Sequence, residues 1–339
     1  MNSPTKPSGG RRRFPGVVPL LLIGCLAACA ASSRAEDKKE PVSLAVSRPL
    51  KLTGFGQFLY AGWEKGVDSF SARRVRLTLA GPVLKNVNFR VMADLARSPL
   101  LVDALVEFSF HKNIGVRAGQ FQIPFSLESL TSVADLDTIN RSQPVEKFAP
   151  GRDNSSQGRD VGVAVFGEYS ILEYALGVFN GSGINKLDTN SHKDFGGRVV
   201  IHPAGFLSVG GSFYKGRRRP GPAGPSVARD MTGLEFSAVH SGASLKGEYI
   251  HAGDDVVSRS GWYLQAGYFF LPKKLQGVVK YDSLDRNLDA AGDRANILTL
   301  GVNWILSGRN RLQLNYEIHR LESGGTDNSA VLAQLQVAF

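Results

Sequence analysis

The sequence is poor in the side chains that usually carry out covalent chemistry. Its two cysteines, Cys25 and Cys29, both lie in an N-terminal apolar run, so the rest of the chain has no cysteine nucleophile, disulfide or thiolate metal site. None of the six histidines lies in an H-E-x-x-H motif, and the sequence contains no G-x-S-x-G motif. A hydrolytic site built from scattered Ser, His and acidic residues is the weaker alternative. We therefore expect no enzyme, no metal site and no cofactor.

Charged residues at alternate positions of amphipathic segments offer a different chemistry, which is the attraction of ions. Eight basic residues share this placement and are candidates for lining an ion pathway: Arg74, Arg76, Arg90, Arg117, Arg198, Lys246, Lys280 and Arg311. Eight acidic residues occupy equivalent positions: Asp94, Asp103, Glu107, Asp194, Glu235, Glu248, Asp282 and Glu317. A fixed positive lining raises the local concentration of anions, provided that binding is weak enough for release. Paired acidic groups cancel part of that field, so the balance of the two sets decides the selectivity.

The residues around these charges alternate with a period of two, as in β-strands. Within residues 309–319, Leu312, Leu314, Tyr316 and Ile318 fall on one face, and polar residues fall on the other. A helix would scatter both sets around its axis. Alternation and turn signals together predict sixteen strands, near 49–62, 69–81, 87–96, 100–111, 114–121, 159–168, 171–180, 193–202, 206–215, 230–240, 243–252, 261–271, 274–282, 295–306, 309–320 and 329–339.

The connections between the predicted strands follow a parity rule. They are short after every even strand and long and polar after most odd strands, with 97–99 as the exception. Outer-membrane barrels combine an even strand number with short periplasmic turns and longer external loops. A periplasmic β-sandwich is the alternative, but it does not predict this parity. We expect an all-β fold, a transmembrane antiparallel up-and-down β-barrel of about 16 strands, whose long third external loop (122–158) folds into the lumen.

The N-terminal region carries an export signal. Residues 1–35 combine a basic start, an apolar run and small residues near the end, which is typical of a cleaved signal peptide. Lipidation at Cys29 is the alternative outcome. We expect residues 36–48 to form a periplasmic linker and residues 49–339 to form the barrel. Without residues 1–35 the chain has 35 basic against 30 acidic residues, a small excess that argues against nucleic acid as a partner.

The last predicted strand ends on an aromatic residue. Val331, Leu335 and Val337 alternate with polar positions, and the sequence stops at Phe339. A terminal aromatic on an amphipathic strand resembles the signal that the outer-membrane barrel assembly machinery recognises. We therefore expect Phe339 to be the assembly signal of this barrel.

The alternation of side chains within a strand also predicts which way individual residues point. Arg73 shares the parity of Val75, which places it near the rim rather than in the lumen. Val102 shares the parity of the apolar face that faces lipid. The link from Gly253 to Ser260 is expected to be a long external loop.

Four motifs resemble the phosphate-selective porin O and P family, and the similarity extends from about Gly54 to Phe339. They are GQFQIPFSLE at Gly119–Glu128, NRS at Asn140–Ser142, RDVG at Arg159–Gly162 and GVFNG at Gly177–Gly181. The resemblance implies a sixteen-stranded, trimeric outer-membrane porin whose third external loop narrows the channel. It also implies that Pro124, Phe125, Glu128, Arg141 and Ser142 belong to this constriction loop. The family's central phosphate-binding lysine has no counterpart, because no lysine lies between Lys112 and Lys147.

Together these features predict an outer-membrane porin, a water-filled channel for passive diffusion of small hydrophilic solutes that is biased to anions such as phosphate. Its expected partners are outer-membrane lipid and lipopolysaccharide, the barrel assembly machinery, small anions as permeants and two further copies in a homotrimer. A non-conducting barrel that serves as an adhesin or structural anchor is the alternative.

Overall fold

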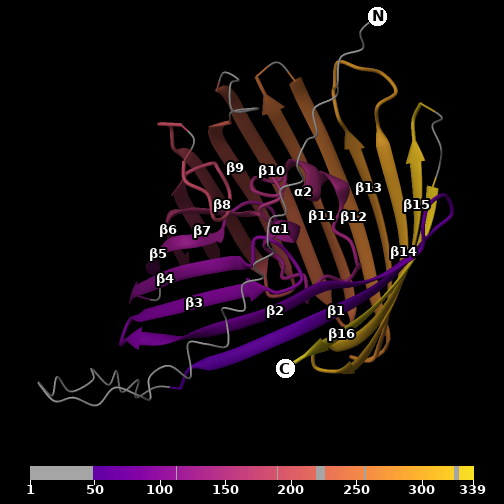
Figure 1. Cartoon of the computed structure of the whole chain (residues 1–339), viewed down its shortest axis with the longest axis horizontal. Coiled ribbons are helices and arrows are strands. Elements are labelled where there is room, and N and C mark those ends of the chain that lie inside the picture. Colours follow the sequence, from indigo (N-terminus) through magenta and orange to yellow (C-terminus); the bar gives the residue numbers. More distant parts are fainter. Residues whose placement is uncertain (1–48, 112, 189, 219–225, 256, 324–327) are drawn as a thin grey trace, which may run out of the picture. The chain divides into compact units, whose positions relative to one another are not determined.

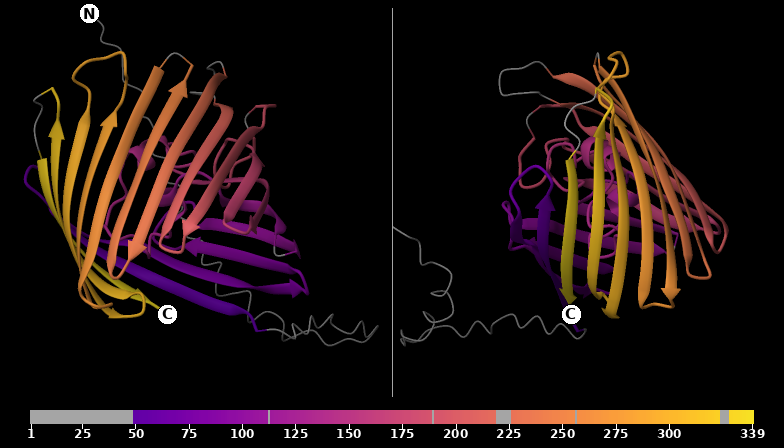
Figure 2. Two further views of the ribbon diagram at one scale, coloured as in Figure 1. Left: turned by 180° about the vertical axis from the view of Figure 1, so that it is seen from behind. Right: turned by 90° about the vertical axis from the view of Figure 1, so that its right-hand side faces the viewer.

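The computed structural model describes residues 49–111, 113–188, 190–218, 226–255, 257–323 and 328–339. The predicted signal peptide (1–35), Cys29 and the predicted linker (36–48) lie outside these residues. The described chain forms a closed barrel in which each strand pairs antiparallel with its neighbours and the first strand pairs with the last (Figure 1, Figure 2). The sixteen-stranded barrel predicted from the sequence is thereby confirmed, and the sandwich alternative is wrong.

The strands are β1 (Lys51–Trp63), β2 (Ser69–Leu84), β3 (Val87–Asp94), β4 (Leu101–His111), β5 (Ile114–Gln122), β6 (Arg159–Tyr169), β7 (Leu172–Phe179), β8 (Asp194–Ala204), β9 (Leu207–Arg218), β10 (Val227–His240), β11 (Ala243–Asp254), β12 (Val257–Leu271), β13 (Leu275–Asp285), β14 (Ala295–Ser307), β15 (Asn310–Leu321) and β16 (Asn328–Ala338). Two short helices, α1 (Leu127–Leu130) and α2 (Gln143–Phe148), lie between β5 and β6. Neither helix is long and apolar enough to cross a membrane.

The two faces of the strands invert the arrangement of a soluble protein. On β15, Leu312 and Leu314 point outward and are 43% and 52% exposed, whereas the inward Gln313 and Asn315 are 1% and 0% exposed. In a closed barrel every backbone group of the wall finds a partner on a neighbouring strand, so the outer face can meet hydrocarbon. The apolar alternation therefore faces outward and the polar alternation fills the interior.

The strands β11 and β12 are longer than predicted, and the loop between them is shorter. The pairing of β11 with β12 continues to Asp254 and Val257, so the long external loop expected at 253–260 shrinks to a tight connection. The carboxylate of Asp254 forms ion pairs with Arg218 of β9 and Arg259 of β12. The polar character of this segment predicts a loop. In the structure its charged side chains form ion pairs between strands, and the strands extend through it.

Two β-bulges correct the parity predictions. The register of β1 with β2 passes from Gln57–Arg74 to Phe58–Ala72, which leaves Arg73 as the extra residue. Arg73 consequently turns inward, where its guanidinium donates to the backbone oxygen of Ile139 at 3.1 Å. Val102 is skipped in the same way between β3 and β4, and it is fully buried instead of facing lipid. A bulge shifts the alternation by one residue, and a sequence pattern does not reveal that shift.

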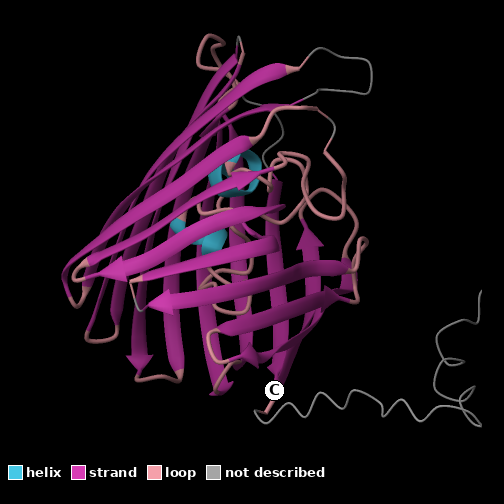
Figure 3. Ribbon diagram, turned by 90° about the vertical axis from the view of Figure 1, so that its left-hand side faces the viewer, coloured by secondary structure: helices cyan, strands magenta, loops and turns pink. Residues whose placement is uncertain are grey.

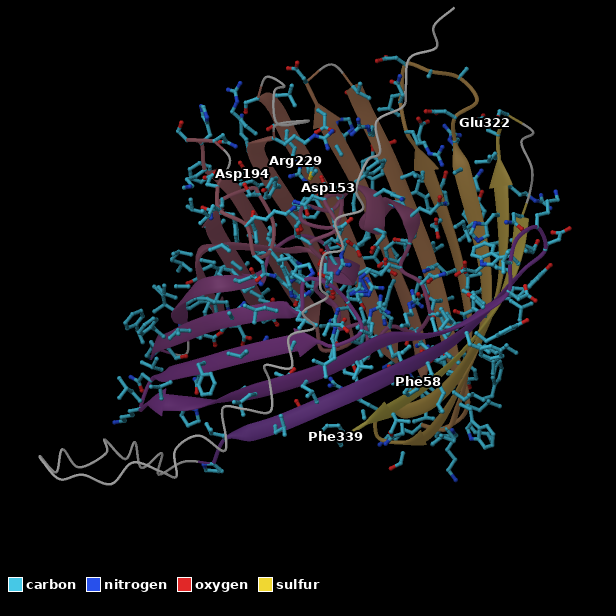
Figure 4. The ribbon with its side chains drawn as sticks, in the orientation of Figure 1. Phe58, Asp153, Asp194, Arg229, Glu322 and Phe339 are labelled. Carbon is cyan, nitrogen blue, oxygen red and sulfur yellow. The ribbon has the colours of Figure 1, made fainter. Side chains whose placement is uncertain are left out.

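The closing pair of strands fixes the position of Phe339. The backbone N–H and C=O of Phe339 each form a hydrogen bond of 3.0 Å with Gly54 of β1. A Cβ atom at Gly54 would lie 2.7 Å from the Phe339 ring, so the absent side chain makes room for that ring. Phe339 is 72% exposed on the outside of the barrel near its periplasmic end (Figure 4).

Candidate channel and its charged lining

The segment between β5 and β6 (residues 123–158, here called the inner loop) packs against inward-facing side chains of the barrel wall. Figure 3 shows α1 and α2 within the outline of the strands. Buried apolar residues of the inner loop join inward residues of β9–β12 in one core, which contains Ile123, Phe125, Val145, Phe148, Tyr214, Met231, Ile250 and Tyr263. These inward-facing wall residues are apolar, unlike most of the barrel lining. The reason is that they contact the inner loop instead of water.

The tip of the inner loop is fastened by one carboxylate. Asp137 accepts hydrogen bonds from Lys246 Nζ at 2.8 Å and from Gln265 Nε2 at 2.9 Å. Lys280, which is 1% exposed, donates to Thr138 Oγ1 at 2.9 Å and to the backbone oxygen of Asn140 at 2.8 Å. Lys246 and Lys280, which are predicted to line the ion pathway, thus bond to the inner loop, and Lys280 also lines a cavity of about 320 Å³ beside it.

Neutral amide side chains hold the rest of the tip. Backbone oxygens of residues 133–137 accept hydrogen bonds from Gln57, Asn303, Gln313 and Gln336. These side chains also bond to one another and to Gln276 and Gln334 at 2.7–2.9 Å. We call the six residues the amide cluster. An uncharged attachment of this kind is insensitive to salt, since screening acts on charges.

The two ends of the inner loop are attached as well. Glu248 of β11 accepts from the backbone N–H groups of Leu127 and Glu128 at 3.0 and 2.6 Å. Glu128 in turn accepts from the backbone N–H and the hydroxyl of Ser142 at 2.9 and 2.8 Å. At the other end Asp153 forms an ion pair with Arg229 of β10, close to Asp194 (Figure 4). The inner loop is thus held mainly by β9–β16 and β1.

Five residues of this loop were singled out in the sequence. Pro124 and Phe125 are buried at the start of the loop. The hydroxyl of Ser142 donates a hydrogen bond to the carboxylate of Glu128. Arg141 donates one hydrogen bond, from Nη2 to the backbone oxygen of Thr131 at 2.5 Å, while its Nε and Nη1 atoms have no partner in the described structure. Of the five, Arg141 alone therefore presents free donors.

Arginines gather on the opposite side, between the inner loop and the wall formed by β1–β4. A cavity of about 140 Å³ there is lined by seven of them: Arg74, Arg76, Arg90, Arg97, Arg141, Arg152 and Arg159. Asp103 and Glu146 are the acidic residues that line it. We call these seven residues the arginine cluster. Guanidinium groups are weakly hydrated and bind carboxylate or phosphate through paired donors, so such a cavity suits anions.

Several members of the arginine cluster are paired within the protein. Arg76 bonds to Asp94 at 3.1 Å, and Arg159 bonds to Asp103 at 2.5 Å. Arg90 lies 4.0 Å from Asp103, and 45% of its side chain is exposed. Arg74 donates to Gln57, a neutral amide, at 3.0 Å. Positive charge therefore remains in excess in this cavity.

Crowding of these positive groups has an electrostatic effect on the inner loop. Burial, aided by neighbouring arginines, lowers the pKa of Arg141 and of Arg152. Because a guanidinium starts from a very high pKa, both residues stay charged at neutral pH. An anion that enters the cavity offsets their mutual repulsion.

The remaining candidates of the sequence lie elsewhere. Arg117 forms a two-point ion pair with Glu107 at 2.7 and 2.9 Å. Arg198 is shared between Glu235 at 2.5 Å and Glu173 at 3.2 Å. Arg311 is 6% exposed, and its Nε and Nη2 atoms have no partner in the described structure. Of the eight predicted residues, Arg74, Arg76 and Arg90 line the 140 Å³ cavity, whereas Arg117 and Arg198 line a second cavity of about 580 Å³.

Shared lining residues connect the arginine cluster with two other cavities. Arg74, Arg97, Arg141 and Glu146 also line a cavity of about 320 Å³, which reaches Trp63 at the external end of β1. Gln122 joins the cluster to a cavity of about 580 Å³, which reaches the short β4–β5 and β6–β7 turns. The three cavities in series form a candidate path, which follows the β2–β8 side of the bore in the two lower cavities and reaches β13–β15 in the external one.

Arg97, Arg152 and Arg159 were missed as site residues. Arg159 is the first residue of β6 within the RDVG motif, and its side chain reaches Asp103 of β4 past the intervening strand β5. Arg97 and Arg152 lie in connections, where no alternation tells inward from outward. Their positive charge is the only sequence feature that points to a role in an anion site. Many exposed loop residues are also basic, so this feature does not single them out.

The chain matches the model of the family described as phosphate-selective porin O and P over residues 59–221 and 222–339. It belongs to this family. The family relationship and the barrel confirm the prediction of a porin in the bacterial outer membrane. An uncharacterized protein of Aquifex aeolicus (strain VF5) is 24% identical to this porin over 341 residues, which cover 81% of either chain.

Solved structures show the same fold as this porin. The anion-selective porin from Comamonas acidovorans gives a TM-score of 0.68 at 16% identity and covers 86% of this chain and 100% of its own. The trimer form of OmpT from Vibrio cholerae gives 0.64 at 12%, with 86% and 99% covered. The outer membrane channel DcaP of Acinetobacter baumannii gives 0.63 at 13%, with 86% and 97% covered.

Proposed function

We propose that this porin is a passive channel for small hydrophilic solutes and that the arginine cluster biases it to anions, phosphate among them. The observation that supports the proposal is the excess of guanidinium groups over carboxylates in the 140 Å³ cavity that lies between the two larger ones. Solutes pass the arginine cluster on the β2–β8 side of the inner loop and enter through the external cavity, whose lining includes residues of β13–β15. The inner loop is then the constriction.

The position of the cluster matters as much as its charge. Arg74 and Arg141, which form no ion pair in the described structure, are only partly exposed, so bulk water screens them less than charges on the surface. At an effective dielectric constant near 20, two unit charges 8 Å apart interact by about 2 kcal/mol. Attraction of this size raises the entry of anions and still permits their release.

Substitution of two cluster arginines tests the anion bias. Arg74 and Arg141 are suitable because neither forms an ion pair with an acidic residue in the described structure. In planar bilayers under a salt gradient, we expect Arg74→Gln with Arg141→Gln to lower the chloride-over-potassium permeability ratio on the order of fivefold. Arg320→Gln, at an exposed position of β15, is the matched control and should leave the ratio unchanged.

Two other results would contradict the proposal. A reversal potential that is the same in the double variant and the unmodified porin would remove the arginine cluster from the selectivity mechanism. Absence of any single-channel conductance would favour the adhesin or anchor alternative. Addition of phosphate to a chloride current distinguishes a phosphate preference from a general anion preference, because phosphate then reduces the current at low concentration.

The assembly of the porin is part of the same proposal. A homotrimer is supported by the trimer form of OmpT, which shares the fold. Contacts with lipopolysaccharide and recognition of Phe339 by the barrel assembly machinery are supported by the exposed apolar wall and by the exposed position of that residue. Native mass spectrometry of detergent-purified protein tests the trimer directly.

A further inference from the structure

The lipid-facing wall carries a groove between β12 and β15 that is separate from the channel. Its volume is about 470 Å³, and its lining is mainly apolar and includes Tyr268 and Tyr316. Its outward-facing lining includes Ala266, Tyr268, Phe270 and Gly277 of β12 and β13, together with residues of β14 and β15. Two small residues, Ala266 and Gly277, lie next to large ones and make the hollow.

One end of the groove lies near the periplasmic end of the barrel. Tyr268 pairs with Gly277 only a few residues from the β12–β13 turn. That turn is one of the short connections, which lie on the periplasmic side in outer-membrane barrels. At about 3.3 Å per residue, Gly277 lies roughly 10 Å from Lys274 in the turn. The part of the groove around Tyr268 and Gly277 is therefore covered by the periplasmic leaflet.

Two adjacent lysines stand at the end of this groove. Lys273 and Lys274 form the exposed β12–β13 turn, and neither makes an ion pair in the described structure. Lysines near the surface of a membrane attract anionic lipid headgroups. A phosphate near these lysines would place the attached acyl chains beside Phe270 and Gly277.

We propose that the groove is a binding site for one phospholipid with an anionic headgroup from the periplasmic leaflet. An acyl chain occupies the hollow over Ala266 and Gly277, and the phosphate contacts Lys273 and Lys274. Hydrocarbon must fill the hollow in the membrane, since a void forfeits dispersion contacts on its lining. The lysine pair selects a phospholipid over a second copy of the chain, because it offers charge to a phosphate at the depth where headgroups lie.

Native mass spectrometry of the full porin, delipidated in detergent and titrated with phosphatidylglycerol, tests this site. We expect one phosphatidylglycerol to bind more tightly than further copies, and phosphatidylcholine to bind more weakly. Ala266→Trp fills the hollow and should abolish the tight site. Lys273→Gln with Lys274→Gln should weaken it by about fivefold for each charge removed.

Matched controls separate the site from general effects. Ala238→Trp places the same ring on β10 outside the groove, and Lys85→Gln removes a lysine from the β2–β3 turn; both should bind as the unmodified porin does. Heat-modifiable mobility on gels verifies that each variant remains a folded barrel. Equal affinities in all variants would overturn the proposal. So would a change of oligomeric state in Ala266→Trp at unchanged lipid affinity, which would identify the groove as a contact between copies.

Discussion

At the scale of single residues, the same side-chain type performs different tasks according to its partners. Arg117 is neutralised by Glu107, whereas Arg141 keeps two donor atoms unpaired in the described structure. Lys246 forms an ion pair with Asp137 of the inner loop, which offsets its charge. The number of basic residues in the bore therefore overstates the positive charge that a passing ion meets.

Asp137 provides a prediction at this scale. Asp137→Asn keeps the size of the side chain but removes the charge that Lys246 and Gln265 contact. Each such hydrogen bond to a charged group contributes about 1.5–3 kcal/mol, so the tip of the inner loop should open more often. Hydrogen exchange in peptides covering residues 130–140 should be faster, and single-channel currents should be noisier. Asp289→Asn, in the exposed β13–β14 loop, is the control, and equal exchange in both variants would contradict this role.

At the scale of elements, the approach of neighbouring strands limits which residues fit. Gly119 of β5 has a φ of +121°, and a Cβ atom there would lie 2.2 Å from the backbone oxygen of Ala104 on β4. Only glycine adopts this backbone without a clash. The glycine of the GQFQIPF motif thus permits the pairing of β4 with β5 and the entry into the inner loop.

The corresponding prediction concerns the stability of the barrel. Gly119→Ala should lower the temperature at which the barrel unfolds, because strained backbone of this kind costs on the order of 1–3 kcal/mol. Heat-modifiable gel mobility measures that temperature. Gly205→Ala is the matched control, since a Cβ at Gly205 meets no atom within 4 Å. An unchanged midpoint for Gly119→Ala would show that β4 and β5 adjust.

At the scale of the whole molecule, the barrel wall and the inner loop are separable. Gln122 of β5 pairs directly with Arg159 of β6, so the strands flanking the inner loop already form a hairpin. The pairing of strands does not pass through residues 123–158. The loop is therefore an addition to a closed wall, held by the amide cluster, the apolar core and ion pairs.

Removal of the loop is the prediction at this scale. An Asn-Gly turn in place of residues 123–158 suits a two-residue hairpin and should leave a folded barrel. We expect the single-channel conductance to rise severalfold, because the bore of a sixteen-stranded barrel is then unobstructed. The chloride preference should fall, since Arg141 and Arg152 leave with the loop. Unchanged conductance in a folded variant would mean that the loop does not narrow the path.

The sequence by itself determined the wall of this protein. Strict alternation, as in Leu312, Leu314 and Tyr316, predicts strands because a pleated backbone sends successive side chains to opposite faces. Short and long connections then predict the even strand number, and the GQFQIPFSLE motif indicates the family. All of this information is local or repeats along the chain.

The tertiary structure alone decided how the interior is arranged. Arg73 faces inward because a bulge shifts its parity, and the guanidinium of Arg159 on β6 reaches Asp103 on β4 past the intervening β5. Lys280 contacts the inner loop, although its alternation is the same as that of a lumen residue. Alternation states which side of the wall a residue faces, whereas the atoms it meets there depend on how the chain folds back into the barrel.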